Sequence, residues 1–102
     1  MPTYAVINDD GTVNWSRDPD LLPPTKTGTG SYQLDFTADC HEDVFVLHAK
    51  TEGPGCDAPS VVASTVQGGP GRICVSITNI FDPSGGVDAR FSYIRYRKAD
   101  EF

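Results

Sequence analysis

Ten glycines and eight prolines punctuate this 102-residue chain instead of gathering in one region, and they separate many short segments. No segment keeps apolar residues at the i, i+3, i+4, i+7 spacing of an amphipathic helix. The best helical candidate, residues 18–24, contains three prolines, which break helices. Several of the short segments instead alternate between apolar and polar residues, as half-buried β-strands do. The sequence therefore predicts an all-β fold.

Seven segments have the composition or alternation of β-strands. Asp10-Gly11 separates the first two and predicts a hairpin, because glycine supplies the positive φ that a tight turn requires. Residues 31–37 alternate cleanly, whereas residues 44–50 are apolar on both faces and are interpreted as a central strand. The predicted strands are 4–7, 12–15, 31–37, 44–50, 61–66, 72–81 and 89–97.

About seven strands separated by frequent turns are typical of an antiparallel β-sandwich, here expected to be jelly-roll-like. The long stretch 17–30 is rich in Pro, Gly and Thr, and we expect it to cross from one sheet to the other. The length fits one domain, residues 1–102, with residues 98–102 as a frayed tail.

The formal net charge is −6 and the isoelectric point is near 4.5. Nucleic-acid phosphates would be repelled by such a chain, so nucleic acid is excluded as a partner. No apolar run approaches the roughly 20 residues that a membrane helix needs, so we expect no membrane insertion. The sequence opens without a signal peptide. A cytoplasmic protein is the default expectation, with a virion component or an exported assembly as the alternative.

The three cysteines are Cys40, Cys56 and Cys74. An odd number excludes a fully paired disulfide framework. Three reduced thiols are the default without an export signal. One bridge with one free thiol stays open, either Cys40 to Cys56 or Cys40 to Cys74.

Five polar or reactive residues follow one another from Asp39 to Asp43 and raise the question of a chemical site. Adjacent residues of an extended chain point to opposite faces, so Cys40 and His41 do not easily converge on one metal ion. The acidic neighbours of Cys40 would raise its pKa, whereas a nucleophilic thiol needs a lowered one. We predict an inter-strand loop whose Cys40 side chain lies in the core.

The other candidate catalytic or metal-binding motifs are incomplete. His48 lies in a strand that is apolar on both faces, which favours a core or interface position over a catalytic one. Asp9-Asp10-Gly11 and Asp18-x-Asp20 resemble fragments of calcium loops but lack the remaining ligands, including the distal glutamate, so a weak calcium site is only a minor alternative. We expect no catalytic residues, no metal site and no cofactor.

Aromatic side chains with nearby loop carboxylates suggest a place for a sugar or a cell-surface ligand. In a small sandwich most aromatic rings belong to the core or to a subunit contact, and this reading competes with ligand binding. The alternation of residues 89–97 separates Phe91 and Tyr93 from Ser92, Ile94 and Tyr96. The candidate ligand-binding residues are Trp15, Tyr32, Tyr96, Asp9 and Asp10.

Five segments together suggest a family: residues 4–12, 28–36, 44–49, 73–77 and 91–93. Their order resembles small β domains of actinobacteria and their phages, which often end tail-fibre-like or other surface proteins. In outline these domains are similar to the H-type lectin and C1q-like sandwiches. The resemblance implies a homotrimer and carries no catalytic motif.

Three functions compete on these grounds. The first is a non-enzymatic binding or assembly module that associates with itself, because a sandwich strand needs only one buried face and residues 44–49 offer two. The second is a carbohydrate-binding, lectin-like domain that uses Trp15 or tyrosine rings. The third, ranked last, is a small enzyme with Cys40 and His41 or His48.

Overall fold

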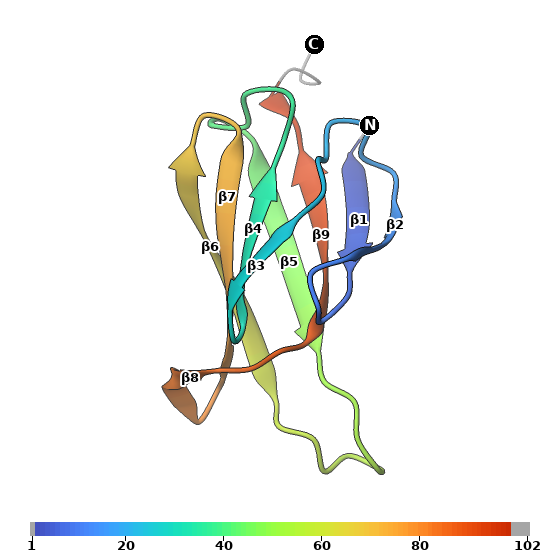
Figure 1. Cartoon of the computed structure of the whole chain (residues 1–102), viewed down its shortest axis with the longest axis vertical. Helices are drawn as coiled ribbons and strands as arrows, with labels where there is room; N and C mark the ends of the chain where they lie inside the picture. The colour runs from blue at the N-terminus through green and yellow to red at the C-terminus, as the bar shows by residue number, and fades with distance from the viewer. Residues whose placement is uncertain (1, 99–102) are drawn as a thin grey trace.

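The computed structural model describes residues 2–98, which form two packed antiparallel sheets (Figure 1). The predicted all-β sandwich is confirmed. The strands are β1 (Thr3–Ile7), β2 (Val13–Ser16), β3 (Thr25–Gly28), β4 (Ser31–Asp35), β5 (Val44–Lys50), β6 (Val61–Gly69), β7 (Arg72–Asn79), β8 (Asp82–Gly86) and β9 (Arg90–Tyr96).

Each sheet forms one layer of the sandwich. The first layer has the strand order β2-β1-β9-β5, and the second has the order β3-β4-β7-β6, with β8 paired to β7. The chain passes between the layers at the β2–β3, β4–β5, β5–β6 and β8–β9 connections. Such repeated crossing is typical of Greek-key and jelly-roll sandwiches. The predicted crossing between residues 17 and 30 is therefore confirmed.

The core lies between the two layers and comes from alternate residues of the inner strands. β1 and β9 supply it from the first layer, and β4 and β7 supply it from the second. Because successive side chains of a strand point to opposite faces, only every second residue takes part. The buried apolar residues are Ala5, Ile7, Tyr32, Leu34, Phe36, Cys40, Ile73, Val75, Ile77, Ala89, Phe91 and Tyr93.

The hairpin predicted at Asp10-Gly11 joins β1 to β2. The Gly11 amide donates to the Asn8 carbonyl at 3.0 Å, and Gly11 has a φ of +91°. The Asp10 carboxylate accepts from the amide and the hydroxyl of Thr12, at 2.9 and 2.6 Å. The turn thus meets its own hydrogen-bonding needs, as expected from its sequence.

Three strand predictions need correction. Strands β3 and β8 lie in stretches predicted to be loop, so the sandwich has nine strands within residues 2–98 instead of about seven. β6 continues to Gly69, through residues interpreted as a turn. Backbone pairing with β4 and β7 forms these strands. β3 (Thr-Lys-Thr-Gly) and β8 (Asp-Pro-Ser-Gly-Gly) have no apolar residue, and the end of β6 is Gly-Gly, so these stretches show no apolar–polar alternation.

The prediction that residues 44–50 form a central strand is wrong. β5 lies at the edge of the first layer and pairs only with β9. Its inner residues are half-buried, and its outer residues, His48 among them, are exposed. His48 is therefore not a core residue. The second apolar face that suggested a central position instead faces outward, away from the opposite layer.

The remaining predictions concern cysteines and the chain end. All three cysteines are free thiols; Cys40 is buried as predicted, and Cys56 and Cys74 are exposed. The Lys98 amide donates to the Asp43 carboxylate at 2.9 Å, so Lys98 is held in place, and the rest of the predicted tail lies outside the described residues. Within residues 2–98 no helix is long and apolar enough to cross a membrane.

Candidate functional site

The side of the first layer that faces away from the core is apolar. Strand pairing places Trp15 beside Val6, and Tyr4 beside Ile94, which in turn lies beside Val46. Val44 lies beside Tyr96 at the end of the same face. We call this surface the outer apolar face; it consists of Tyr4, Val6, Trp15, Val44, Val46, Ile94 and Tyr96.

Most of these side chains are open to water. Trp15 is 47% exposed, Tyr96 50% and Val44 62%. The Trp15 and Tyr4 rings meet edge to face with their centroids 5.5 Å apart, which holds two aromatic rings in a fixed arrangement at the β2 side. A contiguous exposed apolar patch marks a binding site for a partner or a ligand more often than single, scattered apolar residues do.

The seven residues of the outer apolar face carry no charge, and the exposed Arg17, whose amide donates to the Tyr4 carbonyl at 2.7 Å, lies at its margin. The other residues within it are His48 and Ser92, which pair across β5 and β9. The first charged pair in these two strands is Lys50 and Arg90, at the end of the face, where Arg90 lies 4.0 Å from Glu52. The chain has a net charge of −6, so it repels a second acidic molecule. This repulsion is weakest at a four-strand surface without Asp or Glu.

An open groove of about 820 Å³ lies beside β2. Its walls are the β1–β2 turn, the inward side of β2 and the connection 17–24, which contributes Leu21, Leu22 and prolines. Asp10 lies at this groove, whereas Trp15 and Tyr96 do not. The groove therefore does not join the predicted carboxylates to the predicted stacking rings.

The predicted ligand-binding residues fall into three places, of which one is the exposed β1–β2 turn that holds Asp9 and Asp10. Trp15 and Tyr96 share the outer apolar face but lie two strands apart, at opposite ends of it. Tyr32 is 1% exposed, and its hydroxyl donates to the Asp9 carbonyl at 2.7 Å. Burial, the largest cause, raises the pKa of Tyr32. Its ring thus packs in the core and presents no face to a ligand.

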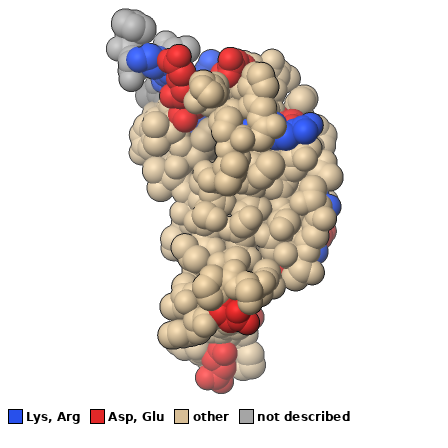
Figure 2. Space-filling view, turned by 90° about the vertical axis from the view of Figure 1, so that its left-hand side faces the viewer, with Lys and Arg blue, Asp and Glu red and all other residues tan. Residues whose placement is uncertain are grey.

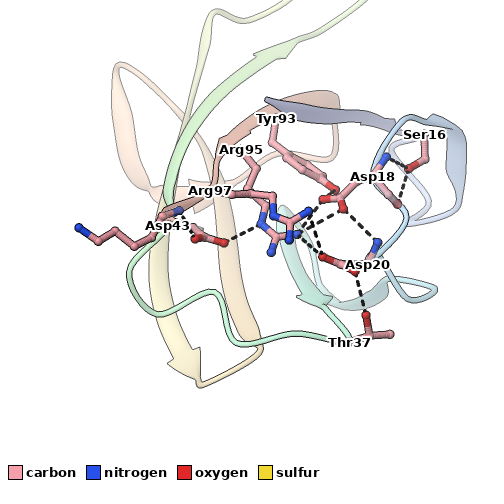
Figure 3. A network of polar contacts seen from close by, with 9 residues as sticks. Ser16, Asp18, Asp20, Thr37, Asp43, Tyr93, Arg95 and Arg97 are labelled. Atoms are coloured by element: carbon pink, nitrogen blue, oxygen red, sulfur yellow. Dashed lines mark hydrogen bonds and ion pairs between the residues drawn. The ribbon is translucent and has the colours of Figure 1, made fainter. Parts of the chain in front are cut away.

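A buried cluster of charges occupies the other side of the first layer (Figure 3). The Arg95 side chain is 1% exposed, and its Nε donates to Asp43 at 2.7 Å. Its Nη1 donates to both Asp18 oxygens, at 3.2 and 3.3 Å, and to Asp20 at 3.4 Å. The guanidinium carbon also lies 4.8 Å from the centre of the Phe36 ring. Burial disfavours the charge of Arg95, but the bonds to Asp43 and Asp18 raise its pKa overall.

This cluster explains the calcium-like fragment Asp18-x-Asp20. The Arg95 guanidinium lies where a cation would lie between these carboxylates, and the Tyr93 hydroxyl donates to Asp18 at 2.9 Å. Burial and the adjacent Asp18 charge raise the pKa of Tyr93, so its hydroxyl keeps its proton. Among the described residues, no group of three or more His, Cys, Asp or Glu side chains is placed to hold a metal ion. The cluster therefore serves to fix the 17–24 and 38–43 loops to β9.

The Cys40 thiol is also enclosed. The Gln67 amide nitrogen lies 3.6 Å from its sulfur. Burial is the largest cause of the raised pKa of Cys40, and the charges of Asp43 and Asp39 act in the same direction. A raised pKa keeps the thiol protonated, which opposes nucleophilic chemistry. His41 is exposed, and His48 lies on the outer side of β5.

Several residues of the outer apolar face were not among the predicted site residues. They are Val6, Val44, Val46 and Ile94, together with Tyr4, which was considered only as one of several aromatic rings. The signal that could have found them is apolar character at both alternate sets of positions in three strands of the same sheet. Strand order was needed to show that these second faces join into one surface.

No family model, no curated protein and no solved structure matches this chain.

Proposed function

We propose that this domain is a non-enzymatic assembly module that binds a second copy of itself through the outer apolar face. The observation that carries the proposal is the continuity of that face across all four strands of the first layer without a charged side chain. Aromatic residues are enriched in protein interfaces and charged residues are depleted from their centres. Tyr4, Trp15 and Tyr96 give this face three aromatic rings.

The size of the face suits contact with a second copy. Aromatic side chains bury about 150–250 Å² each when enclosed, so three half-exposed rings and four aliphatic side chains offer roughly 600 Å². A standard interface buries about 800 Å² on each partner, which places this contact at the lower end of specific association. A face that packs on its own copy about a two-fold axis closes as a dimer.

The test is the solution mass of the natural chain and of a variant with one charge in the middle of the face. Ile94→Lys places an ammonium group between Tyr4 and Val46, where burial against a second copy would leave it unpaired. We expect light scattering to give at least twice 11.0 kDa for the natural chain and a lower mass for the variant.

The matched control is Ser76→Lys, which adds the same charge to the outward side of β7 in the second layer. Both variants are compared by circular dichroism and thermal melting, so that a folding defect is recognised. Equal masses for Ile94→Lys and the Ser76→Lys control would overturn the proposal, as would a natural chain of 11.0 kDa.

Carbohydrate binding is the competing use of this face, because Trp15 offers a half-exposed ring. A glycan array separates the two. The lectin-like function would be favoured if the protein is monomeric and binds a glycan, and if the Trp15→Ala variant no longer binds that glycan. Self-association without glycan binding is the result expected from the assembly function.

A further inference from the structure

β6 lies at a free edge of the second layer. A sandwich with open edges has four edge strands, and proteins protect such strands with charge, proline, bulges or short length. β2 and β3 have four residues each and irregular pairing, and β3 also carries Lys26. β5 ends in Lys50. β6 has nine residues and neither a charge nor a proline, and its register shift lies between Gln67 and Gly69, beyond residues 62–66.

One half of β6 is open to water on both of its faces. Val61 and Ala63 pack against the core, but all residues from Ser64 to Gly68 are exposed. Val66 is 70% exposed and Val62 52%. Figure 2, which looks onto the side of the molecule where β6 lies in Figure 1, shows a broad middle band without Lys, Arg, Asp or Glu; most of the charged atoms visible there lie toward the two ends and along one margin.

The backbone of this edge is available for pairing. β6 pairs only with β7, in the register that places Ser64 beside Ser76. At the start of the ladder the Ile80 amide donates to the Ser60 carbonyl at 3.1 Å. Hydrogen-bonded and non-hydrogen-bonded pairs alternate along an antiparallel ladder. The amides and carbonyls of Ala63 and Thr65 therefore point away from β7, toward the free edge.

The sequence of this edge matches itself when it is reversed. Residues 62–66 read Val-Ala-Ser-Thr-Val, with Ser64 in the centre, small residues on either side and a valine at each end. An antiparallel pair about a two-fold axis at Ser64 places Val62 of one copy opposite Val66 of the other, twice. It also places the two Ser64 hydroxyls opposite each other. Cross-strand pairs of β-branched residues and of hydroxyl residues stabilise a sheet relative to alanine pairs.

We propose that β6 pairs antiparallel with β6 of a second copy, centred on Ser64, so that the second layers of two molecules form one continuous sheet. The pairing makes about four backbone hydrogen bonds between Ala63 and Thr65 of the two copies. A two-fold contact uses the same surface on both identical molecules, and the reversed sequence match places like residues opposite each other at Val62, Ser64 and Val66. The contact uses a different strand from the outer apolar face, so it goes beyond the proposed function and does not depend on it.

The first test is Ser64→Lys against Ser76→Lys. The two serines are neighbours on the outward side of the same sheet, but only Ser64 lies at the edge and on the symmetry axis. Ser64→Lys places two ammonium groups opposite each other, which opposes pairing. We expect the solution mass to fall for Ser64→Lys and not for Ser76→Lys. Equal masses for the two variants would overturn the proposal.

The second test reads the register directly. Ser64→Cys is made in a chain in which the exposed Cys56 and Cys74 are replaced by serine, leaving Cys40 buried. Opposed residues of a non-hydrogen-bonded pair have Cα atoms about 4.5 Å apart, within the range that a disulfide bridges. Oxidised glutathione should give a covalent dimer on a non-reducing gel. Ser76→Cys in the same background is the control, and equal cross-linking of the two would contradict the register.

Combining the variants separates this proposal from the proposed function. If both contacts exist, the natural chain grows beyond a dimer, Ile94→Lys and Ser64→Lys each leave a dimer, and the double variant has a mass of 11.0 kDa. If Ile94→Lys alone lowers the mass, the edge proposal fails and the proposed function stands. If Ser64→Lys alone lowers it, the reverse holds.

Discussion

The two layers of the sandwich both turn apolar residues toward the core, but they differ in the residues on their outer sides. The second layer has apolar residues inside, among them Leu34 and Val75, and mostly polar residues outside: Ser31, Gln33, Asp35, Ser64, Arg72, Ser76 and Thr78. The first layer has the buried Arg95 cluster on its inner side and the outer apolar face on the other. A sheet covered by water is expected to look like the second layer. The first layer departs from that pattern, and this departure is the basis of the proposed self-association.

The largest expected effect comes from removing the buried charge that only the first layer has. Arg95→Ala leaves Asp18 and Asp43 buried without their cation, which costs about 3–5 kcal/mol for a broken buried ion pair. We expect the free energy of unfolding to fall by that amount in urea titrations. Arg72→Ala, which breaks the exposed pair with Asp35 in the second layer, should change it far less. Equal losses of unfolding free energy in Arg95→Ala and Arg72→Ala would contradict this difference between the layers.

A smaller difference is expected between the two buried tyrosines. Tyr93 of the first layer donates to the Asp18 carboxylate, and Tyr32 of the second donates to the neutral Asp9 carbonyl. Hydrogen bonds to charged groups contribute about 1.5–3 kcal/mol and neutral ones about 0.5–1.5 kcal/mol. Tyr93→Phe should therefore destabilise the fold more than Tyr32→Phe. Thermal and urea unfolding of the two variants measure this, and the opposite order would contradict the assignment.

Exchanging the outer sides of the layers should change association more than folding. In Val46→Thr with Ile94→Thr, the β-branched shape remains and the apolar character is lost, so we expect unfolding free energies within about 1 kcal/mol of the natural chain and weaker self-association. Ser76→Val with Thr78→Val gives the second layer an apolar outside. We expect that variant to gain association, measured by sedimentation. If the Ser76→Val, Thr78→Val variant does not gain association, apolar composition alone is not sufficient to form the interface.

The smallest effect concerns acid. The Arg72 hydrogen bond lowers the pKa of Asp35, and the Lys26 hydrogen bond lowers the pKa of Asp88. A carboxyl with a lowered native pKa stabilises the fold at neutral pH, and this contribution is lost as the pH falls through the ordinary value of 3.8 and below. Asp35→Asn should therefore reduce slightly the loss of thermal stability between neutral and acid pH. An unchanged acid dependence would count against the Asp35–Arg72 pair.

The sequence allowed the architecture to be predicted where local pattern and turn chemistry agree. The alternation of Tyr32, Leu34 and Phe36 and the turn at Asp10-Gly11 are both present in the structure. β3 and β8 could not be predicted, because neither contains an apolar residue whose alternation would mark a strand, and both form by pairing with a neighbouring strand. Apolar residues on both sides of β5 suggested a central strand. Composition alone does not distinguish a strand that is covered on both sides from a strand whose second apolar side is exposed.

The candidate surfaces were harder to predict than the fold. Asp18 and Arg95 lie 77 positions apart in the sequence, so no local spacing indicates their contact. The outer apolar face likewise requires the order β2-β1-β9-β5, which brings the beginning and the end of the chain together. Trp15, Tyr32 and Tyr96 were all predicted as possible stacking rings. The alternation that groups Tyr32 with Leu34 and Phe36 already favoured a buried ring, and Tyr32 is buried in the structure.

The pairing of β1 with β9 also bears on how the chain folds during synthesis. Residues 3–7 bond with residues 91–95, and β9 also pairs with β5, so the middle of the first layer is filled last. Contacts this distant in sequence slow folding, because a long loop must close before they form. A nascent chain that has not yet released β9 from the ribosome would present β1 and β5 without the strand between them. We expect such stalled chains to be cleaved readily by protease and to become resistant only once residue 96 has emerged.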